Sequence, residues 1–173
     1  HLGQLEAVGL LRRVPRLDPV TKRQLPTRYI LGFEPGFTTV AVVPCPEIGH
    51  GEDGGAEIAD MNADGYPEVL VYTQSAGSGS YGNVIAYSAN RNQSMSQIAF
   101  PNIADHAKAG KGYMGHDEFA VVENTLVQRF RVYQPNDTNA KPTGAMRQIQ
   151  YKLRNGEASR QFVIDRIVEY PMD

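Results

Sequence analysis

The feature that most constrains the fold is a series of short runs rich in β-branched and aromatic residues, separated by glycine, proline, asparagine and aspartate. Such runs are typical of β-strands joined by turns. The clearest run covers residues 147–153, where apolar and polar side chains alternate with the period of a strand that buries one face. Asn155-Gly156 then predicts a tight two-residue hairpin turn, and residues 161–170 form the returning strand.

The same signals predict further strands at residues 28–33, 38–43, 56–60, 68–73, 83–88, 97–100, 119–122 and 126–133. Short strands at regular spacing favour an all-β fold, an antiparallel β-sandwich or flattened barrel of about eight strands. Neither an internal repeat nor a long linker divides the chain, so we expect one domain over residues 1–173. Residues 1–27 carry three prolines among charged residues, which predicts an irregular lead-in with one short element around residues 5–14.

Composition sets outer limits on the class of protein. The chain is 41% hydrophobic with a net charge of -2, an ordinary globular composition. Cys45 is the single cysteine, which excludes an internal disulfide framework, and we expect it to be a buried apolar residue. We expect no membrane span, because no apolar run approaches the ~20 residues that a bilayer requires. The first residue, His1, follows no visible signal peptide, which is compatible with a processed, exported chain.

Charge is unevenly distributed along the chain. No lysine or arginine lies between Arg28 and Arg91, and this stretch carries the acidic residues Glu34, Glu47, Glu52, Asp53, Glu57, Asp60, Asp64 and Glu68. An acidic face argues against nucleic acid as a partner, since that binding depends on neutralising phosphates. It suits a cationic partner or a metal ion, and the alternative is a solvated surface that aids solubility.

The segment between the strands at 68–73 and 83–88 is rich in glycine and serine. Gly77 to Gly82 formally matches the dinucleotide pattern GxGxxG, but a strand follows where that pattern needs a helix. What remains is a narrow hairpin tip in which Ser78 and Tyr81 can donate hydrogen bonds without carrying charge. Such donors suit a target with two catalytic carboxylates, such as a glycoside hydrolase. The alternative is a hairpin turn that binds nothing.

Residues 68–81 resemble the corresponding part of the bacterial periplasmic inhibitors of invertebrate-type lysozyme. The signature of that family is Ser-Gly-x-Tyr, which Ser78, Gly79 and Tyr81 match in order and spacing. Residues 115–133, which begin Gly115-His116-Asp117, also look like the family, and the similarity covers roughly residues 55–170.

The resemblance implies a non-enzymatic, cofactor-free β-sandwich or barrel that is exported to the periplasm. Its loop Ser78-Gly79-Ser80-Tyr81 would enter the active-site cleft of lysozyme and block access to peptidoglycan. Related inhibitor families add a basic side chain on a neighbouring loop, and Arg91 is the nearest candidate here. The resemblance leaves a homodimer open.

A second candidate site is the acidic turn, residues 60–68. Asp60, Asn62 and Asp64 alternate ahead of Gly65, as at the start of a calcium loop. A full EF-hand is excluded because its twelfth position is not glutamate, so only a shorter loop closed by Glu68 would bind calcium; the alternative is a metal-free turn. A calcium-dependent adhesion or carbohydrate-binding module is therefore the second functional hypothesis.

Two further hypotheses concern the histidines. His106 and His116 lie near acidic residues, but their separation does not favour a metal site, and we expect satisfied or exposed loop histidines. A hydrolase that uses the loop serines is the third hypothesis, and no motif places any of these histidines, or His50, beside those serines.

Overall fold

The structure is a computed structural model. It describes residues 11–17, 20, 24–33, 38–43, 55–75, 77–91, 93–157 and 159–172. Cys45 and His50 lie outside these residues. The expected fold class is confirmed: the described chain is all-β, with a single short 3-10 turn at Ile103–Asp105. The sheets do not close into a barrel, which favours the sandwich over the flattened barrel. Among the described residues, no helix has the length and hydropathy to span a membrane.

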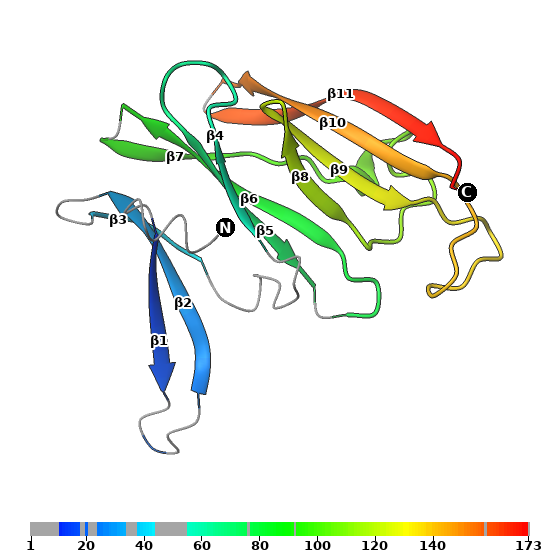
Figure 1. Cartoon of the computed structure of the whole chain (residues 1–173), viewed down its shortest axis with the longest axis horizontal. Helices are drawn as coiled ribbons and strands as arrows, with labels where there is room; N and C mark the ends of the chain where they lie inside the picture. The colour runs from blue at the N-terminus through cyan, green and yellow to red at the C-terminus, as the bar shows by residue number, and fades with distance from the viewer. Residues whose placement is uncertain are drawn as a thin grey trace.

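Two four-stranded antiparallel sheets form the sandwich (Figure 1). One sheet has the order β4-β5-β6-β7, with strands Ala56–Ala59, Glu68–Gln74, Gly82–Asn90 and Ser94–Ile98. The other has the order β11-β10-β9-β8, and in chain order β8 to β11 are Glu118–Val122, Thr125–Arg131, Met146–Asn155 and Arg160–Tyr170. Because β4 lies against β8 and β7 against β11, the strands of the two sheets face one another in matching order.

A third antiparallel sheet has the order β1-β2-β3, formed by Leu11–Leu17, Gln24–Phe33 and Thr38–Val43. The expectation of an irregular lead-in over residues 1–27 with one short element around residues 5–14 differs from the structure, in which residues 11–17 and 24–27 belong to paired strands. Residues 5–10 of the expected element lie outside the described residues. The prolines misled the prediction: register shifts between Val14 and Arg16, so the β1–β2 pair accommodates Pro15 in an irregularity of the ladder.

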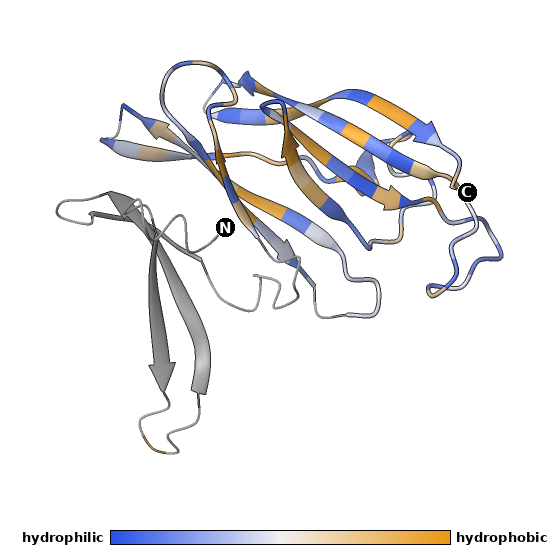
Figure 2. Ribbon diagram, in the orientation of Figure 1, coloured by the Kyte–Doolittle hydropathy of each residue, from blue (hydrophilic) through white to orange (hydrophobic). Residues whose placement is uncertain are grey.

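The core lies between the two four-stranded sheets. Its buried side chains come from both layers: Leu70, Tyr72, Val84, Ala86, Ile98, Ile103, Ala109, Leu126, Phe130, Ile149, Tyr151 and Phe162. Figure 2 shows the alternation of apolar and polar residues along β10 that the sequence predicted. Phe100 contacts the rings of Phe119, Tyr151 and Phe162, and so links strands of one sheet at the centre of the core.

Two local predictions differ from the structure. The strand expected at 97–100 is β7, Ser94–Ile98, and at Ala99 the chain crosses to the other sheet, where it forms a parallel bridge with Gln161. The β10–β11 connection spans residues 156–159 instead of a two-residue Asn155-Gly156 turn, and the Gly156 N–H donates to the Ser159 carbonyl at 2.9 Å.

Candidate functional site

The two candidate sites lie at opposite ends of the sandwich. The signature loop, residues 75–81, joins β5 to β6 at one end, and we call this the signature end. The acidic turn, residues 60–68, lies at the other end with the β6–β7 turn and the β10–β11 connection. Strand β6 runs from one end to the other, and at about 3.3 Å per residue its nine residues separate the ends by roughly 25 Å.

Backbone contacts close the signature loop. The Ser75 N–H donates to the Tyr81 carbonyl at 2.9 Å, and the Tyr81 N–H donates to the Ser75 hydroxyl at 2.9 Å. Within the loop, the Ser80 N–H donates to the Gly77 carbonyl at 2.9 Å. Ser80 has a φ of 43°, in the left-handed region that a tight turn requires. The tip therefore has a defined shape before any partner binds.

The signature residues also explain one another. The Tyr81 ring folds over Gly79, so that a Cβ on Gly79 would lie 2.5 Å from a ring carbon. Gly115 closes the loop from the other side. A Cβ added to Gly115 would lie 1.9 Å from the Gly79 carbonyl oxygen, and the φ of Gly115 is 86°. The N–H of His116 donates to that same carbonyl at 2.9 Å. Glycine at 79 and 115 thus permits the close approach of two backbones and a ring.

Asp117 ties this arrangement to the core. One carboxylate oxygen accepts from the Gly82 N–H at 2.7 Å and from the Tyr113 hydroxyl at 2.7 Å, and the other accepts from the Gln128 amide at 2.5 Å. The Tyr151 hydroxyl in turn donates to the Gln128 carbonyl oxygen. Burial raises the pKa of Asp117, against the lowering effect of these donors. All of its partners are neutral groups.

A second loop, residues 132–145, lies beside the tip. The Asn139 side-chain amide donates to the Ser78 carbonyl at 2.6 Å. The loop is itself held by Asp137, whose carboxylate accepts from the N–H groups of Gln134 and Thr143 and from the Thr143 hydroxyl. The two segments beside the signature loop, residues 115–117 and residues 132–145, are therefore both ordered by contacts of their own.

The side chains of the tip remain available. Ser78 is exposed, and Tyr81 is 47% exposed, although its ring packs on Gly79 and makes a T-shaped contact with the Tyr113 ring at 5.6 Å between centroids. Within the described part of the chain, neither the Ser78 nor the Tyr81 hydroxyl has a hydrogen-bond partner. The loop holds its backbone through internal contacts and presents two uncharged hydroxyl groups outward.

The structure does not bring Arg91 to this site. Arg91 directly follows β6 in the turn at the far end, where it lies near Asp64 and Arg160. Ser78, Gly79, Ser80 and Tyr81 form one surface, and the predicted basic residue belongs to a different one.

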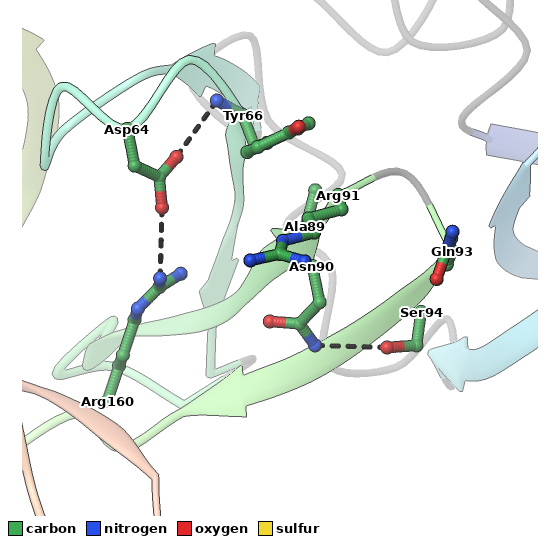
Figure 3. Close-up of a pocket in the computed structure, with 8 residues that line it drawn as sticks. All are labelled: Asp64, Tyr66, Ala89, Asn90, Arg91, Gln93, Ser94 and Arg160. Carbon is green, nitrogen blue, oxygen red and sulfur yellow. Dashed lines mark hydrogen bonds and ion pairs between the residues drawn. The ribbon is translucent and has the colours of Figure 1, made fainter.

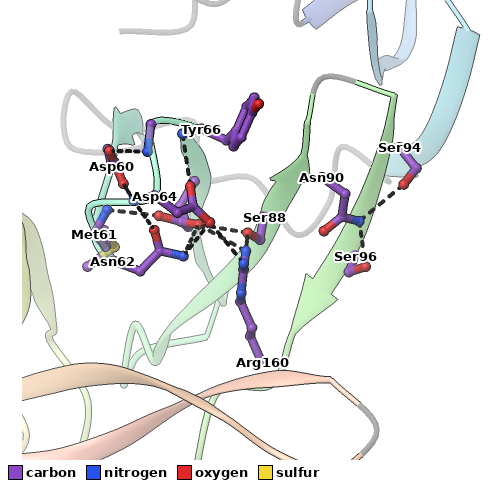
Figure 4. Close-up of polar contacts among 12 residues, drawn as sticks. Asp60, Met61, Asn62, Asp64, Tyr66, Ser88, Asn90, Ser94, Ser96 and Arg160 are labelled. Atoms are coloured by element: carbon purple, nitrogen blue, oxygen red, sulfur yellow. Dashed lines mark hydrogen bonds and ion pairs between the residues drawn. The ribbon is translucent and has the colours of Figure 1, made fainter.

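At the acidic turn, carboxylates accept from the backbone of the turn itself (Figure 4). Asp60 accepts from the N–H groups of Asp64 at 3.1 Å and Gly65 at 2.9 Å, and the Asp64 carboxylate accepts from the Tyr66 N–H at 2.9 Å. Asn62 contributes both ends of its amide, accepting from the Asp64 N–H and donating to the Asp64 carboxylate. The hydrogen bond from the Tyr66 N–H to the Asp64 carboxylate is the main reason why the pKa of Asp64 lies below its ordinary value.

Glu68 is fully buried behind the turn. It accepts from the Met61 N–H at 2.8 Å and the Ser88 hydroxyl at 2.7 Å. Arg160 reaches it from β11, with a nitrogen 3.5 Å from the Glu68 carboxylate and another 2.9 Å from that of Asp64. Burial raises the pKa of Glu68 in spite of these partners. Over the described residues, no three His, Cys, Asp or Glu side chains are grouped as a metal site.

Sequence reasoning missed the residues that hold each site from a distance. Arg160 lies 96 residues from Asp64, so no local sequence pattern predicts the ion pair between them. Asn139 lies 61 residues from Ser78. Gly115-His116-Asp117 carried a family signal, but its part in closing the signature loop needed the structure. His106 is exposed and accepts from the Ala109 N–H at 3.0 Å.

The comparisons with known proteins bear on one segment of the chain, which includes the signature loop and the acidic turn. No curated protein and no solved structure gives a match to this chain. One family model does match, over a segment that contains β4 to β6 and the signature loop but ends before Gly115. The resemblance drawn from Ser78, Gly79 and Tyr81 is thereby confirmed: residues 42–113 match the family described as periplasmic lysozyme inhibitor of I-type lysozyme.

Proposed function

We propose that this protein is a non-enzymatic inhibitor of I-type lysozyme in the periplasm, and that its signature loop enters the active-site cleft of the enzyme. The family match supports the inhibitor role and the kind of partner. The observation that carries the mechanism is the pair of hydroxyl groups, on Ser78 and Tyr81, that have no hydrogen-bond partner among the described residues, at a tip whose backbone is fixed.

The chemistry of the tip fits a cleft that contains catalytic carboxylates. A glycoside hydrolase cuts with two carboxyl groups, and a hydroxyl donates to a carboxylate without bringing a charge. Each hydrogen bond to a charged group contributes about 1.5 to 3 kcal/mol. Because internal contacts already order the tip, binding would lose little loop entropy. The remaining contacts would come from the rim, including the exposed Met114.

A non-enzymatic role fits the surroundings of the loop serines. Among the described residues, no histidine side chain is hydrogen-bonded to Ser78 or Ser80, and His116 meets the loop through its backbone N–H. The described residues therefore offer these serines no activating base of the kind that the hydrolase hypothesis requires. Self-association stays a prediction.

The test separates the hydroxyl groups from the ring that packs on Gly79. The double variant Ser78→Ala/Tyr81→Phe removes both hydroxyls and keeps the ring in place. We expect inhibition in a cell-wall lysis assay with I-type lysozyme to weaken by about 10²- to 10⁴-fold, from the loss of two such bonds. The melting temperature should not change.

The matched control is Tyr66→Phe/Ser159→Ala, which removes the same two groups at the opposite end of the sandwich, and it should inhibit like the wild type. Equal potency of Ser78→Ala/Tyr81→Phe and the wild type would refute the insertion of this loop. Parallel assays with chicken-type and goose-type lysozymes test the choice of enzyme, since preference for either over I-type lysozyme would contradict the proposed partner.

A further inference from the structure

The end of the sandwich opposite the signature loop contains an open hollow with a polar lining. It has a volume of about 490 Å³ and is lined by Asp64, Tyr66, Ala89, Asn90, Arg91, Gln93, Ser94 and Arg160 (Figure 3). A second hollow, of about 550 Å³, lies on the other side of the Asp64–Arg160 pair and is lined also by Arg154. Both volumes fall in the range of small-molecule sites.

The charges of this lining are unequal. Asp64 is the one acidic residue of the first hollow, whereas Arg91 and Arg160 both line it. Asp64 is already engaged by Arg160 at 2.9 Å. In the part of the chain that the structure describes, Arg91 has no carboxylate within ion-pair distance. Among the described residues, the Arg91 guanidinium is thus a cation of this lining that no carboxylate offsets.

The positions of the two guanidinium groups point to one ligand group between them. In Figure 3 the Arg91 side chain extends across the hollow toward Arg160 and Asp64. Arg160 is held in place from behind by Asp64, Glu68 and the hydroxyl of Ser88. Arg160 is already paired with Asp64 and Glu68, so the charge that favours an anion there comes from Arg91, and a guanidinium fork matches a carboxylate or a phosphate in geometry.

The turn that carries Arg91 has a defined backbone. The φ of Arg91 is 52°, in the left-handed region that a tight hairpin requires, and the Gln93 N–H donates to the Asn90 carbonyl at 3.0 Å. Asn90 beside it is fixed by donating to the hydroxyls of Ser94 and Ser96, so the turn that carries Arg91 is ordered.

We propose that this hollow binds the anionic group, a carboxylate or a phosphate, of a small polar ligand, with Arg91 and Arg160 as its two cationic contacts. Tyr66 and Ser94 line the same space and supply hydroxyls for the rest of such a ligand. The site is separate from the signature loop by the length of β6 and does not depend on the proposed inhibition of lysozyme.

The test is a titration of the folded protein with inorganic phosphate and, separately, with acetate, followed by ¹H–¹⁵N NMR at constant ionic strength with chloride as balance. We expect saturable shifts at the Arg91 side-chain N–H and at the amides of the hollow. The Arg91→Gln variant should weaken binding at least tenfold. Arg166→Gln, a change of the same kind at an exposed arginine that lines neither hollow, should bind within twofold of the wild type.

The two anions separate the two ligand chemistries, since the one that saturates at lower concentration names the preferred group. Shifts that fail to saturate with both anions would overturn the proposal, as would equal affinity of Arg91→Gln and the wild type. Arg91→Gln should still inhibit lysozyme, so that failure of this site and failure of the signature loop give different results.

Discussion

A carboxylate lies behind the loop at each end of the sandwich, Glu68 fully buried and Asp117 partly buried, and the two are neutralised differently. Asp117, behind the signature loop, is surrounded by a backbone N–H, a tyrosine hydroxyl and an amide. Glu68, behind the acidic turn, also accepts from neutral donors but has the guanidinium of Arg160 beside it. Burial raises the pKa of both carboxyls.

This difference in the partners of the two carboxylates determines which groups each end of the sandwich presents at its surface. At the signature end the charge is hidden and tied to neutral groups, which leaves a tip of uncharged hydroxyls. At the opposite end the ion pair reaches the surface, where the side chain of Arg160 is 26% exposed and that of Asp64 is 32% exposed. We therefore expect changes at the first end to alter inhibition, and changes at the second to alter stability.

The largest effect should come from Gly115→Ala. The new Cβ would lie 1.9 Å from the Gly79 carbonyl oxygen at a φ of 86°, so the loops must separate. Overpacking together with left-handed strain costs about 2 to 4 kcal/mol of unfolding free energy, as measured by denaturant titration. Inhibition should fall more than tenfold in the lysis assay, because the tip loses its shape.

Gly77→Ala is the control for that change, since a Cβ on Gly77 meets nothing within 4 Å. It should keep both stability and inhibition. If Gly115→Ala inhibited as well as Gly77→Ala, a fixed tip would not be needed for binding.

The next effect in size should come from Arg160→Met. The change leaves Glu68 buried without its cation, although the Ser88 hydroxyl and the Met61 N–H remain. Loss of one partner of a buried ion pair is strongly destabilising, and we expect about 2 kcal/mol here because Arg160 is partly exposed. Inhibition by the folded protein should be unchanged.

A double-mutant cycle with Glu68→Gln tests the cause of that loss. If the unpaired carboxylate is responsible, Arg160→Met should cost less in the Glu68→Gln background. The same cost in both backgrounds would assign the effect to lost packing instead.

A smaller effect should appear in the dependence of stability on pH. A carboxyl whose pKa is raised on folding takes up its proton in the folded state first, so the unfolding free energy increases as the pH falls from the raised value toward the ordinary one. For Glu68 this window lies above the ordinary pKa of 4.5, and for Asp117 above 3.8. Asp64, whose pKa is lowered, acts oppositely, and its stabilising contribution is lost below its ordinary pKa of 3.8.

Denaturant unfolding of Glu68→Gln over the same pH series is the measurement. Its unfolding free energy should change less with pH than that of the wild type above pH 4.5. A wild-type unfolding free energy that decreased steadily as the pH was lowered through this window would contradict the raised pKa of Glu68 and of Asp117.

Prediction from sequence succeeded where structure is local. The strand at 38–43 has the predicted bounds, and β8 and β10 differ from prediction by a few residues at most, because alternation with a period of two is written directly in the chain. It was less exact for β1, which continues past Pro15 to Leu17 although the expected element ended near residue 14, and it was wrong at the Asn155-Gly156 turn, where Ser159 closes a wider connection.

The candidate sites divide in the same way. Ser78, Gly79 and Tyr81 could be predicted because a four-residue spacing carries the signature, and the structure places them together in the β5–β6 loop. Of the acidic residues expected to form one face, Asp64 and Glu68 are paired with Arg160 from a distant strand, and Glu34, Glu47, Glu52 and Asp53 lie outside the described residues. Arg91 was close to the signature loop in sequence only, because an extended strand separates residues that a helix or turn would keep together.

The smallest effect, and the sharpest test of the acidic turn, is the response to calcium. Asp60 and Asp64 already accept from backbone N–H groups, and Arg160 supplies the cation that Asp64 and Glu68 share. A calcium ion would have to displace this arginine and break those bonds, so we expect no change of melting temperature in millimolar calcium. The control is Arg160→Met, which frees the two carboxylates and should respond more than the wild type. A calcium-dependent rise in the wild type would show that the turn rearranges to bind metal, and would revive the adhesion or carbohydrate-binding hypothesis.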